Sequence, residues 1–253
     1  MKKIFIHAIA GILASTVLSC SNPSNITGLF SSGYSSDPAS PMVTDTVKIS
    51  GIAALSAQHG LKVVYQQSDE NIAIIEAPAD LLDKIALTDK DKSLTVATSE
   101  RISSGREKVT VTVKSPSVHE FSSSSGSSLL IPQPYKTPSS GELSLSATSG
   151  SCLNATELQA EIVGVDSSSG ASIRINATAQ SLACDASSGS LIIVEGVASA
   201  VAFEASSGAS VNADRLKAET GEAQASSGGA ITCFVNKMTS SKSSSGGSIN
   251  NLK

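Results

Sequence analysis

The sequence predicts an all-β protein, a single-stranded parallel β-helix with coils of about 19–20 residues. Three observations predict this fold class. A Ser-Gly pair recurs through the second half of the chain, apolar and polar residues alternate on both sides of each pair, and aromatic residues make up only 3% of the 253 residues. The core must therefore be built from small and β-branched side chains.

The Ser-Gly pairs recur at nearly constant spacing. Their glycines are separated by 24, 20, 19, 19, 20 and 18 residues. This period is much shorter than a propeller blade, and the Leu-x-x-Leu-x-Leu pattern of a leucine-rich repeat is missing. The long first interval contains three prolines, which predict a loop inserted into one coil. The glycines are Gly126, Gly150, Gly170, Gly189, Gly208, Gly228 and Gly246.

Apolar residues occupy odd offsets from each glycine, at −7, −5, +3 and +5, with small Ala or Ser at −3. Alternation with period two is typical of strands that are buried on one face. Coils of constant length can stack about 4.8 Å apart, so equivalent side chains form columns. Glycine tolerates a positive φ and serine hydroxyls bond nearby backbone groups, which predicts a corner at each Ser-Gly. A flat antiparallel sandwich, the structural alternative, does not require such columns. The +3 column contains Leu153, Ile173, Ile192, Val211, Ile231 and Ile249.

The region before the first regular coil is less repetitive. Its alternating segments predict strands at 47–51, 61–65, 93–96 and 108–113, and residues 78–85 predict one short helix that starts at a proline. Ser104-Gly105 is expected to mark an early coil. These irregular coils should cap the open end of the stack, where strand edges would otherwise be unpaired.

The N-terminus predicts export and lipidation. Lys2 and Lys3 precede an apolar stretch of signal-peptide length, which ends in Val-Leu-Ser-Cys and resembles a bacterial lipobox. Residues 1–19 are then a signal peptide, and Cys20 is the lipidated N-terminus of the mature chain. An ordinary secretory signal cut nearby is the alternative. The polar residues that follow predict a disordered tether at 20–45, and the domain covers 46–253.

Several segments together resemble the head GIN domain, a bacterial family labelled a putative auto-transporter adhesin. They are the opening Val-x-Ile-x-Gly-Ile, the Leu-Lys-Val-Val-Tyr strand, the short helix, the Val-Thr-Val-Thr-Val-Lys-x-Pro strand and the Ser-Gly coils. The resemblance covers residues 45–253. It implies a β-helix and a surface-binding role, and it brings no catalytic residues. The family's usual turn aspartate is missing here, which argues against a cation at the turns.

One outward-facing column, four residues before each glycine, could carry chemistry. Stacked carboxylates about 5 Å apart raise each other's proton affinity or recruit a cation or partner. A Ca²⁺ site needs six to eight oxygens, and only a few coils contribute here. A solvated acidic stripe that discourages aggregation is the simpler interpretation. The column contains Asp166, Asp185, Glu204 and Gln224.

The remaining cysteines predict neither a disulfide nor a metal site. Cys184 and Cys233 fall in inward columns about two coils apart, which is too far for a bridge. Cys152 should face outward. No cysteine pairs with a histidine at metal-ligand spacing, so we expect no metal and no cofactor.

Composition and residue types favour a non-catalytic protein. A net charge of −4 gives no basic patch for nucleic acid. Arg174 and Arg215 are isolated in the sequence, tryptophan is absent, and the only histidines of the mature chain are His59 and His119, so no acid–base or nucleophile set is expected.

The predicted function is that of a lipid-anchored envelope protein of a Gram-negative bacterium. Cys20 would hold it to the outer membrane, facing the periplasm or the surface, and its partner would be a glycan or a protein surface. Two alternatives remain open: a polysaccharide-active lyase or esterase, and a purely structural envelope component.

Overall fold

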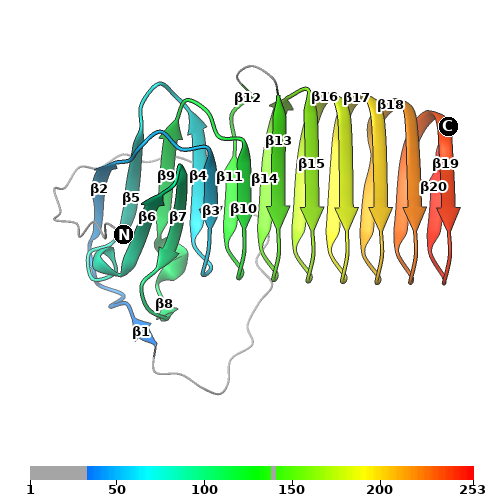
Figure 1. Cartoon of the computed structure of the whole chain (residues 1–253). Helices are drawn as coiled ribbons and strands as arrows, with labels where there is room; N and C mark the ends of the chain where they lie inside the picture. The colour runs from blue at the N-terminus through cyan, green and yellow to red at the C-terminus, as the bar shows by residue number, and fades with distance from the viewer. Residues whose placement is uncertain (1–32, 138–140) are drawn as a thin grey trace.

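The computed structural model describes residues 33–137 and 141–253. It confirms the predicted fold class: a single chain winds through parallel coils that stack from the middle of the chain to its C-terminal end (Figure 1). Strands of one coil pair with strands of the next coil. In the regular part these are β10 (Glu120–Ser123), β11 (Ser128–Ile131), β12 (Tyr135–Lys136), β13 (Glu142–Ala147), β14 (Cys152–Gln159), β15 (Ile162–Ser167), β16 (Ser172–Ala186), β17 (Leu191–Ala205), β18 (Ser210–Ala225), β19 (Ala230–Ser243) and β20 (Ser248–Asn251).

The predicted columns are present. Ile173 of β16 lies directly opposite Ile192 of β17, which lies opposite Val211 of β18. These three side chains are at most 1% exposed. Two sheet-like sides of each coil therefore pack against each other, and alternate residues of both sides form one continuous apolar core.

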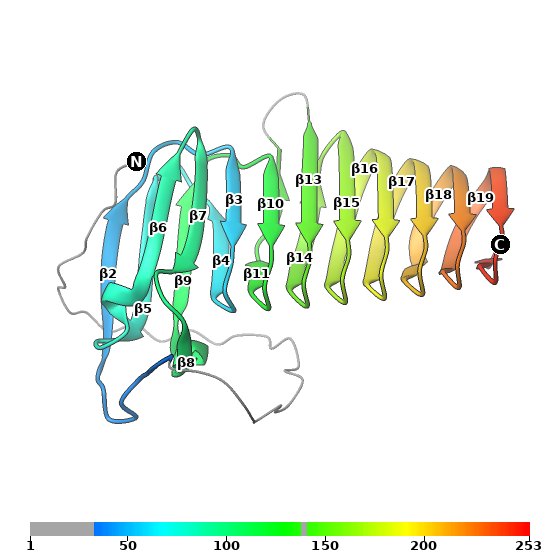
Figure 2. The same cartoon turned by 60° about the horizontal axis from the view of Figure 1, so that its bottom comes forward.

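The corners line up along one edge of the stack (Figure 2). In one corner, Ser188 and Gly189 have φ values of 52° and 70°, and the backbone N–H of Ser190 donates to the carbonyl of Ser187 at 3.2 Å. Two successive positive φ values are those of a type I′ turn. The Gly189 N–H also donates to the Ser207 carbonyl of the next coil at 3.1 Å, so the corner itself joins the stack.

Glycine is required at these corners because of its positive φ, and not because a side chain would lack room. A Cβ added to Gly189 would meet nothing within 4 Å. The sequence predicted the positive φ of the glycine, but the preceding serine is left-handed too, which is uncommon outside glycine and asparagine. In the corners where a serine follows the glycine, that serine is buried. In the Gly189 corner, the hydroxyl of this serine, Ser190, donates to the Ser167 carbonyl at 2.7 Å.

Three aromatic rings fill the core where the irregular and regular coils meet. Tyr65, Phe121 and Tyr135 pack edge to face, with ring centroids 4.9 to 5.6 Å apart. The Tyr65 hydroxyl donates to the Ser115 carbonyl at 2.8 Å. Tyr135 belongs to the predicted insertion of the first long interval, part of which lies outside the described residues. The composition predicted a core of small residues and gave no sign of this cluster.

The N-terminal region contains parallel and antiparallel strands. It consists of β2 (Met42–Lys48), β3 (Ala54–Ala57), β4 (Lys62–Gln67), β5 (Ile72–Pro78), β6 (Ile85–Lys90), β7 (Ser93–Thr98) and β9 (Thr110–Ser115), with 3-10 turns η1 (Leu82–Lys84) and η2 (Arg106–Lys108). β3 and β4 form the first regular coil, with His59-Gly60 at its corner. β7 and β9 pair with β3 and β4 as the coil before it.

The Ser104-Gly105 pair lies in the corner of that earlier coil, as expected, but the corner is widened. The paired positions Ala57 and Val63 are six positions apart in the sequence, whereas their partners Val96 and Val111 are fifteen positions apart. Residues 99–109 supply the difference, including the short strand β8 (Ile102–Ser104) and η2. Gly105 therefore stands outside the offsets that the regular corners share.

The expected helix at 78–85 is wrong in extent. Only Leu82–Lys84 form a 3-10 turn, because buried Ile85 and Leu87 alternate with less buried residues and belong to β6, which pairs antiparallel with β7. β5 and β6 were not predicted. η1 joins β5 on one side of the stack to β6 on the other, and buried Leu81 and Leu82 close this end of the core, which confirms the predicted capping role.

The domain begins earlier than residue 46. β1 (Tyr34–Ser35) pairs with β8, and β2 pairs antiparallel with β5, so residues 33–45 include strands instead of continuing the tether. The Asp80 carboxylate holds this segment through the Asp37 N–H at 2.8 Å and the Ser36 hydroxyl at 3.0 Å. Partners that are distant in the sequence hold these polar residues in place, and the composition of a segment cannot predict such partners.

We predict that Ile173→Asp or Ile192→Asp unfolds the stack, because each places a charge in a continuous apolar column at a cost of several kcal/mol. Thermal melts followed by circular dichroism should show loss of the cooperative transition or a fall of more than about 10 °C. Ser172→Asp, on the outward side of the same strand, is the matched control and should melt close to wild type. Wild-type melting of both isoleucine variants would show that the column assignment is wrong.

We predict that Gly189→Ala lowers the free energy of unfolding by about 1–2 kcal/mol, since it places an L side chain in the left-handed region. Gly164→Ala is the control, because its added Cβ also meets nothing within 4 Å and its φ is not positive. Denaturant titration should find Gly164→Ala equal to wild type or slightly more stable. Equal losses in both variants would refute a conformational role for the corner glycine.

Candidate functional site

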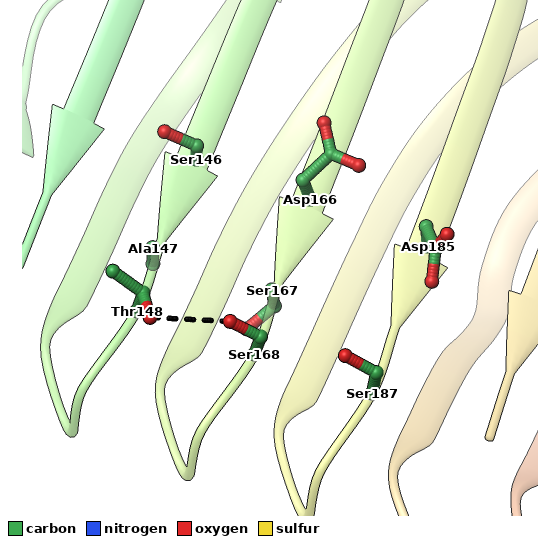
Figure 3. Close-up of a pocket in the computed structure, with 8 residues that line it drawn as sticks. All are labelled: Ser146, Ala147, Thr148, Asp166, Ser167, Ser168, Asp185 and Ser187. Carbon is green, nitrogen blue, oxygen red and sulfur yellow. Dashed lines mark hydrogen bonds between the residues drawn. The ribbon is translucent and has the colours of Figure 1, made fainter. Parts of the chain in front are cut away.

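The predicted acidic column forms a straight row on the outside of the stack. Asp166 of β15 lies opposite Asp185 of β16, which lies opposite Glu204 of β17, and Glu204 lies opposite Gln224 of β18. All four residues are exposed. Figure 3 shows Asp166 and Asp185 on neighbouring coils, with Ser146 preceding them on the coil before. The sequence therefore placed these residues correctly; their role remains a prediction.

A shallow depression of about 220 Å³ lies beside the first two carboxylates. Its polar lining includes hydroxyl groups from three successive coils, and the Ser168 hydroxyl donates to the Thr148 hydroxyl at 3.1 Å (Figure 3). The depression is open to solvent and is formed by the ends of strands next to the corners. Its lining residues are Ser146, Ala147, Thr148, Asp166, Ser167, Ser168, Asp185 and Ser187.

The column belongs to a wider acidic face. We use this name for the outward side chains of β10, β13 and β15 and of residues 181–186, 200–205 and 220–225 in β16, β17 and β18. These described segments contain six carboxylates and no lysine or arginine. Between the acids lie mostly small side chains, such as Gly164, Ala183 and Ala202, so most of the surface is flat; Ile162 is the one large apolar outward side chain of these described segments. The six acids are Glu120, Glu142, Asp166, Asp185, Glu204 and Glu222.

Partial burial raises the pKa of the Asp166 carboxyl, and the Asp185 carboxylate beside it raises the pKa further. Within residues 33–137 and 141–253, no group of three or more His, Cys, Asp or Glu side chains is arranged to hold a metal ion. The carboxylates stand in a row, one per coil, and a row presents its oxygens outward. The geometry suits contact with an extended partner better than enclosure of a cation.

The cysteines of the stack lie where the sequence placed them. Cys184 is buried between Val165 and Phe203 of the adjoining coils, and Cys233 is buried beside Ala213. Burial raises the pKa of both thiols, so they are protonated at neutral pH. Cys152 faces outward and is partly exposed. Cys184 and Cys233 thus serve as small apolar core residues.

On the strand segments outside the acidic face, the structure corrects the expectation that the two arginines of the stack are isolated. Arg174 and Arg215, which are isolated in the sequence, both approach Glu195, with nitrogen–oxygen distances of 3.8 and 3.1 Å. A bulge after Ile193 shifts the register and sets Glu195 opposite Arg215. Gly196, with a φ of 113°, follows Glu195 there. The three side chains form a surface ion-pair row and contain no nucleophile.

The predicted signal peptide, Cys20 and half of the predicted tether lie outside the described residues. In the part of the chain that is described, no helix is long and apolar enough to cross a membrane.

We predict that Asp166→Asn raises the free energy of unfolding at pH 7 by about 0.5 kcal/mol, since like charges on opposed strand positions repel. A raised carboxyl pKa means that the folded state holds its proton more tightly than the unfolded chain. The cost of the charge is therefore present at pH 7 and disappears as the pH falls through the raised pKa. Melts at pH 7 should show a gain of about 1–2 °C, shrinking toward pH 4.

Glu142→Gln is the control for this prediction, because Glu142 lies opposite Ile162 and has no carboxylate in register. A gain of equal size in Glu142→Gln would attribute the effect to net charge instead of to the Asp166–Asp185 contact.

Solved structures from Parabacteroides and Bacteroides species share this fold. A "putative lipid binding protein" from Parabacteroides distasonis ATCC 8503 is 15% identical with a TM-score of 0.76, covering 87% of this chain and 100% of its own. A "putative adhesin" from Parabacteroides merdae ATCC 43184 is 15% identical with a TM-score of 0.74, covering 87% and 99%. Another from Bacteroides fragilis NCTC 9343 is 17% identical with a TM-score of 0.64, covering 87% and 100%.

At these identities the structural likeness establishes the fold alone. No curated protein matches the sequence. The family described as "Putative auto-transporter adhesin, head GIN domain" matches residues 53–253, which is most of the chain and includes every regular coil. This confirms the resemblance noted in the sequence, and the chain belongs to the head GIN domain family.

Proposed function

We propose that this chain is a non-catalytic binding protein of the bacterial cell envelope, which contacts its partner through the acidic face. The family description and the description of two of the similar structures as adhesins support an adhesive role. The observation that carries the proposal is the face itself: six carboxylates, with no basic residue among them, on a flat side of a rigid stack.

The shape of the face favours a broad partner. Small side chains between the acids let another surface approach the strands closely along several coils, as protein interfaces of standard size require. Unpaired carboxylates favour partners that present cationic groups or hydroxyl donors. A protein surface with lysine and arginine, or a glycan that carries amino groups, has this chemistry.

We further propose that Cys20 carries the lipid and holds the protein to the outer membrane. The lipobox-like Val-Leu-Ser-Cys supports this, and Ser21 lacks the charge of an aspartate retention signal. A protein anchored by several acyl groups stays at the membrane, whereas a protein with one acyl group binds the membrane only marginally. The solenoid would then project from the membrane at the end of a short polar segment.

The binding proposal is tested with residues 21–253, without the lipid, on glycan arrays and intact bacterial cells. Asp166→Asn/Asp185→Asn/Glu204→Gln removes three charges from the acidic face, and Glu70→Gln/Glu76→Gln/Asp214→Asn removes three from other surfaces. We expect at least a tenfold loss of binding in the first variant only, with strong dependence on salt. Equal binding by both variants, or none by wild type, would contradict the proposal.

The same protein should be incubated with polysaccharides and acylated glycans. We expect no turnover; release of oligosaccharide or acyl groups would make the chain a polysaccharide-active enzyme and refute the non-catalytic assignment. For the anchor, Cys20→Ser should move the full-length protein from the membrane fraction to the soluble fraction and abolish labelling by a fatty-acid probe. Retention of the label would contradict the lipid assignment.

A further inference from the structure

The terminal coil, residues 239–251, departs from the coils before it on its inward side. Ser241 and Ser243 occupy the positions that Ala223 and Ala225 hold one coil earlier, and Asn251 follows Cys233 in the same way. Both alanines and the cysteine are buried, whereas both serines are exposed and Asn251 is partly exposed. Three inward positions of this coil are therefore polar, and Ile249, opposite Ile231, is the inward residue that stays apolar.

Asn251 closes the backbone of the preceding strand. Its side-chain oxygen accepts the Val235 N–H at 2.9 Å, and its side-chain nitrogen donates to the Val235 carbonyl at 3.0 Å. β20 ends at Asn251 while β19 continues past Val235. The amide thus takes the place of the peptide group that a longer strand would have supplied to Val235.

The β19 part of the terminal coil also carries polar side chains. The Thr239 hydroxyl donates to the Gly221 carbonyl at 3.1 Å, and Lys242 lies in register beside Gln224 with its side chain exposed. Lysine on an edge strand opposes pairing with a further strand, because its charge would have to be brought against another chain.

The opposite end of the molecule has a comparable feature. Asp45 lies on the edge strand β2 with the same parity as Val43 and Val47, which pack against the core. Its Oδ2 atom is buried without a hydrogen-bond partner. An inward-facing carboxylate at a sheet edge disfavours extension of the core by a second chain.

We propose that the terminal coil is a polar cap that prevents end-to-end association with a second copy of this chain. The regular coils are built to stack, since each leaves a complete row of backbone groups and an apolar column for the next. The inward serines, Asn251 and the edge lysine distinguish the terminal coil from the coils that accept another coil. This inference stands apart from the proposed binding by the acidic face.

The test converts the cap into a stacking surface. Ser241→Val/Ser243→Val/Asn251→Val makes the inward positions apolar, and Ser240→Val/Lys242→Val/Asn250→Val makes three outward positions of the same coil apolar. Size-exclusion chromatography with light scattering over a concentration series should show the mass of two copies for the inward variant. Wild type and the outward variant should keep the mass of one copy.

A folded inward variant that stays at the mass of one copy would overturn the proposal. So would an outward variant that associates equally, because added apolar surface alone would then explain the result. If the triple variant does not fold, Ser241→Val and its control Ser240→Val replace it. Concentration-dependent association of Ser241→Val alone is then the expected result, and its absence overturns the proposal.

Discussion

The hydrogen bond from each corner glycine to the serine carbonyl of the next coil holds this molecule in register. It recurs at 3.1 Å from Gly126 through Gly228, always from a glycine that follows a left-handed serine. The type I′ corner turns the chain from one side of the coil to the other in the same number of residues each time. Because that number is constant, the strand residues that flank each corner lie above their counterparts in the next coil.

Register then separates the core from the surface. A column that begins inward stays inward, so Ile173, Ile192 and Val211 form one dry row while Asp166, Asp185 and Glu204 form an exposed one. Each exposed row thus repeats, coil after coil, the chemistry of the residue type at one position of the coil. The acidic face arises in this way: each of its six segments adds one carboxylate and no positive charge, and the terminal coil beyond it carries Lys242 beside Gln224. A flat side of repeated chemistry suits contact with an extended partner.

The sequence was sufficient wherever structure depends on spacing. The corners, the inward columns, the burial of Cys184 and Cys233 and the positions of the acidic column all follow from offsets to a glycine. The sequence was insufficient where contacts between segments far apart in the chain determine the local structure. β5 and β6 are ordered by antiparallel partners, residues 33–45 by Asp80, and Arg215 meets Glu195 only because a bulge shifts the register. None of these contacts has a local pattern. The column's position could be predicted, but its partner cannot be derived from spacing.

Amide hydrogen exchange at the corner glycines tests the central role of these hydrogen bonds most directly. Gly126, Gly150, Gly170, Gly189, Gly208 and Gly228 are all exposed, yet each N–H is bonded to the next coil. We expect their amides to exchange slowly, with opening free energies near that of the core strands, and the Gly246 amide of the terminal coil to exchange fast. Fast exchange at all seven glycines would contradict the account, because the corners would then be independent surface turns.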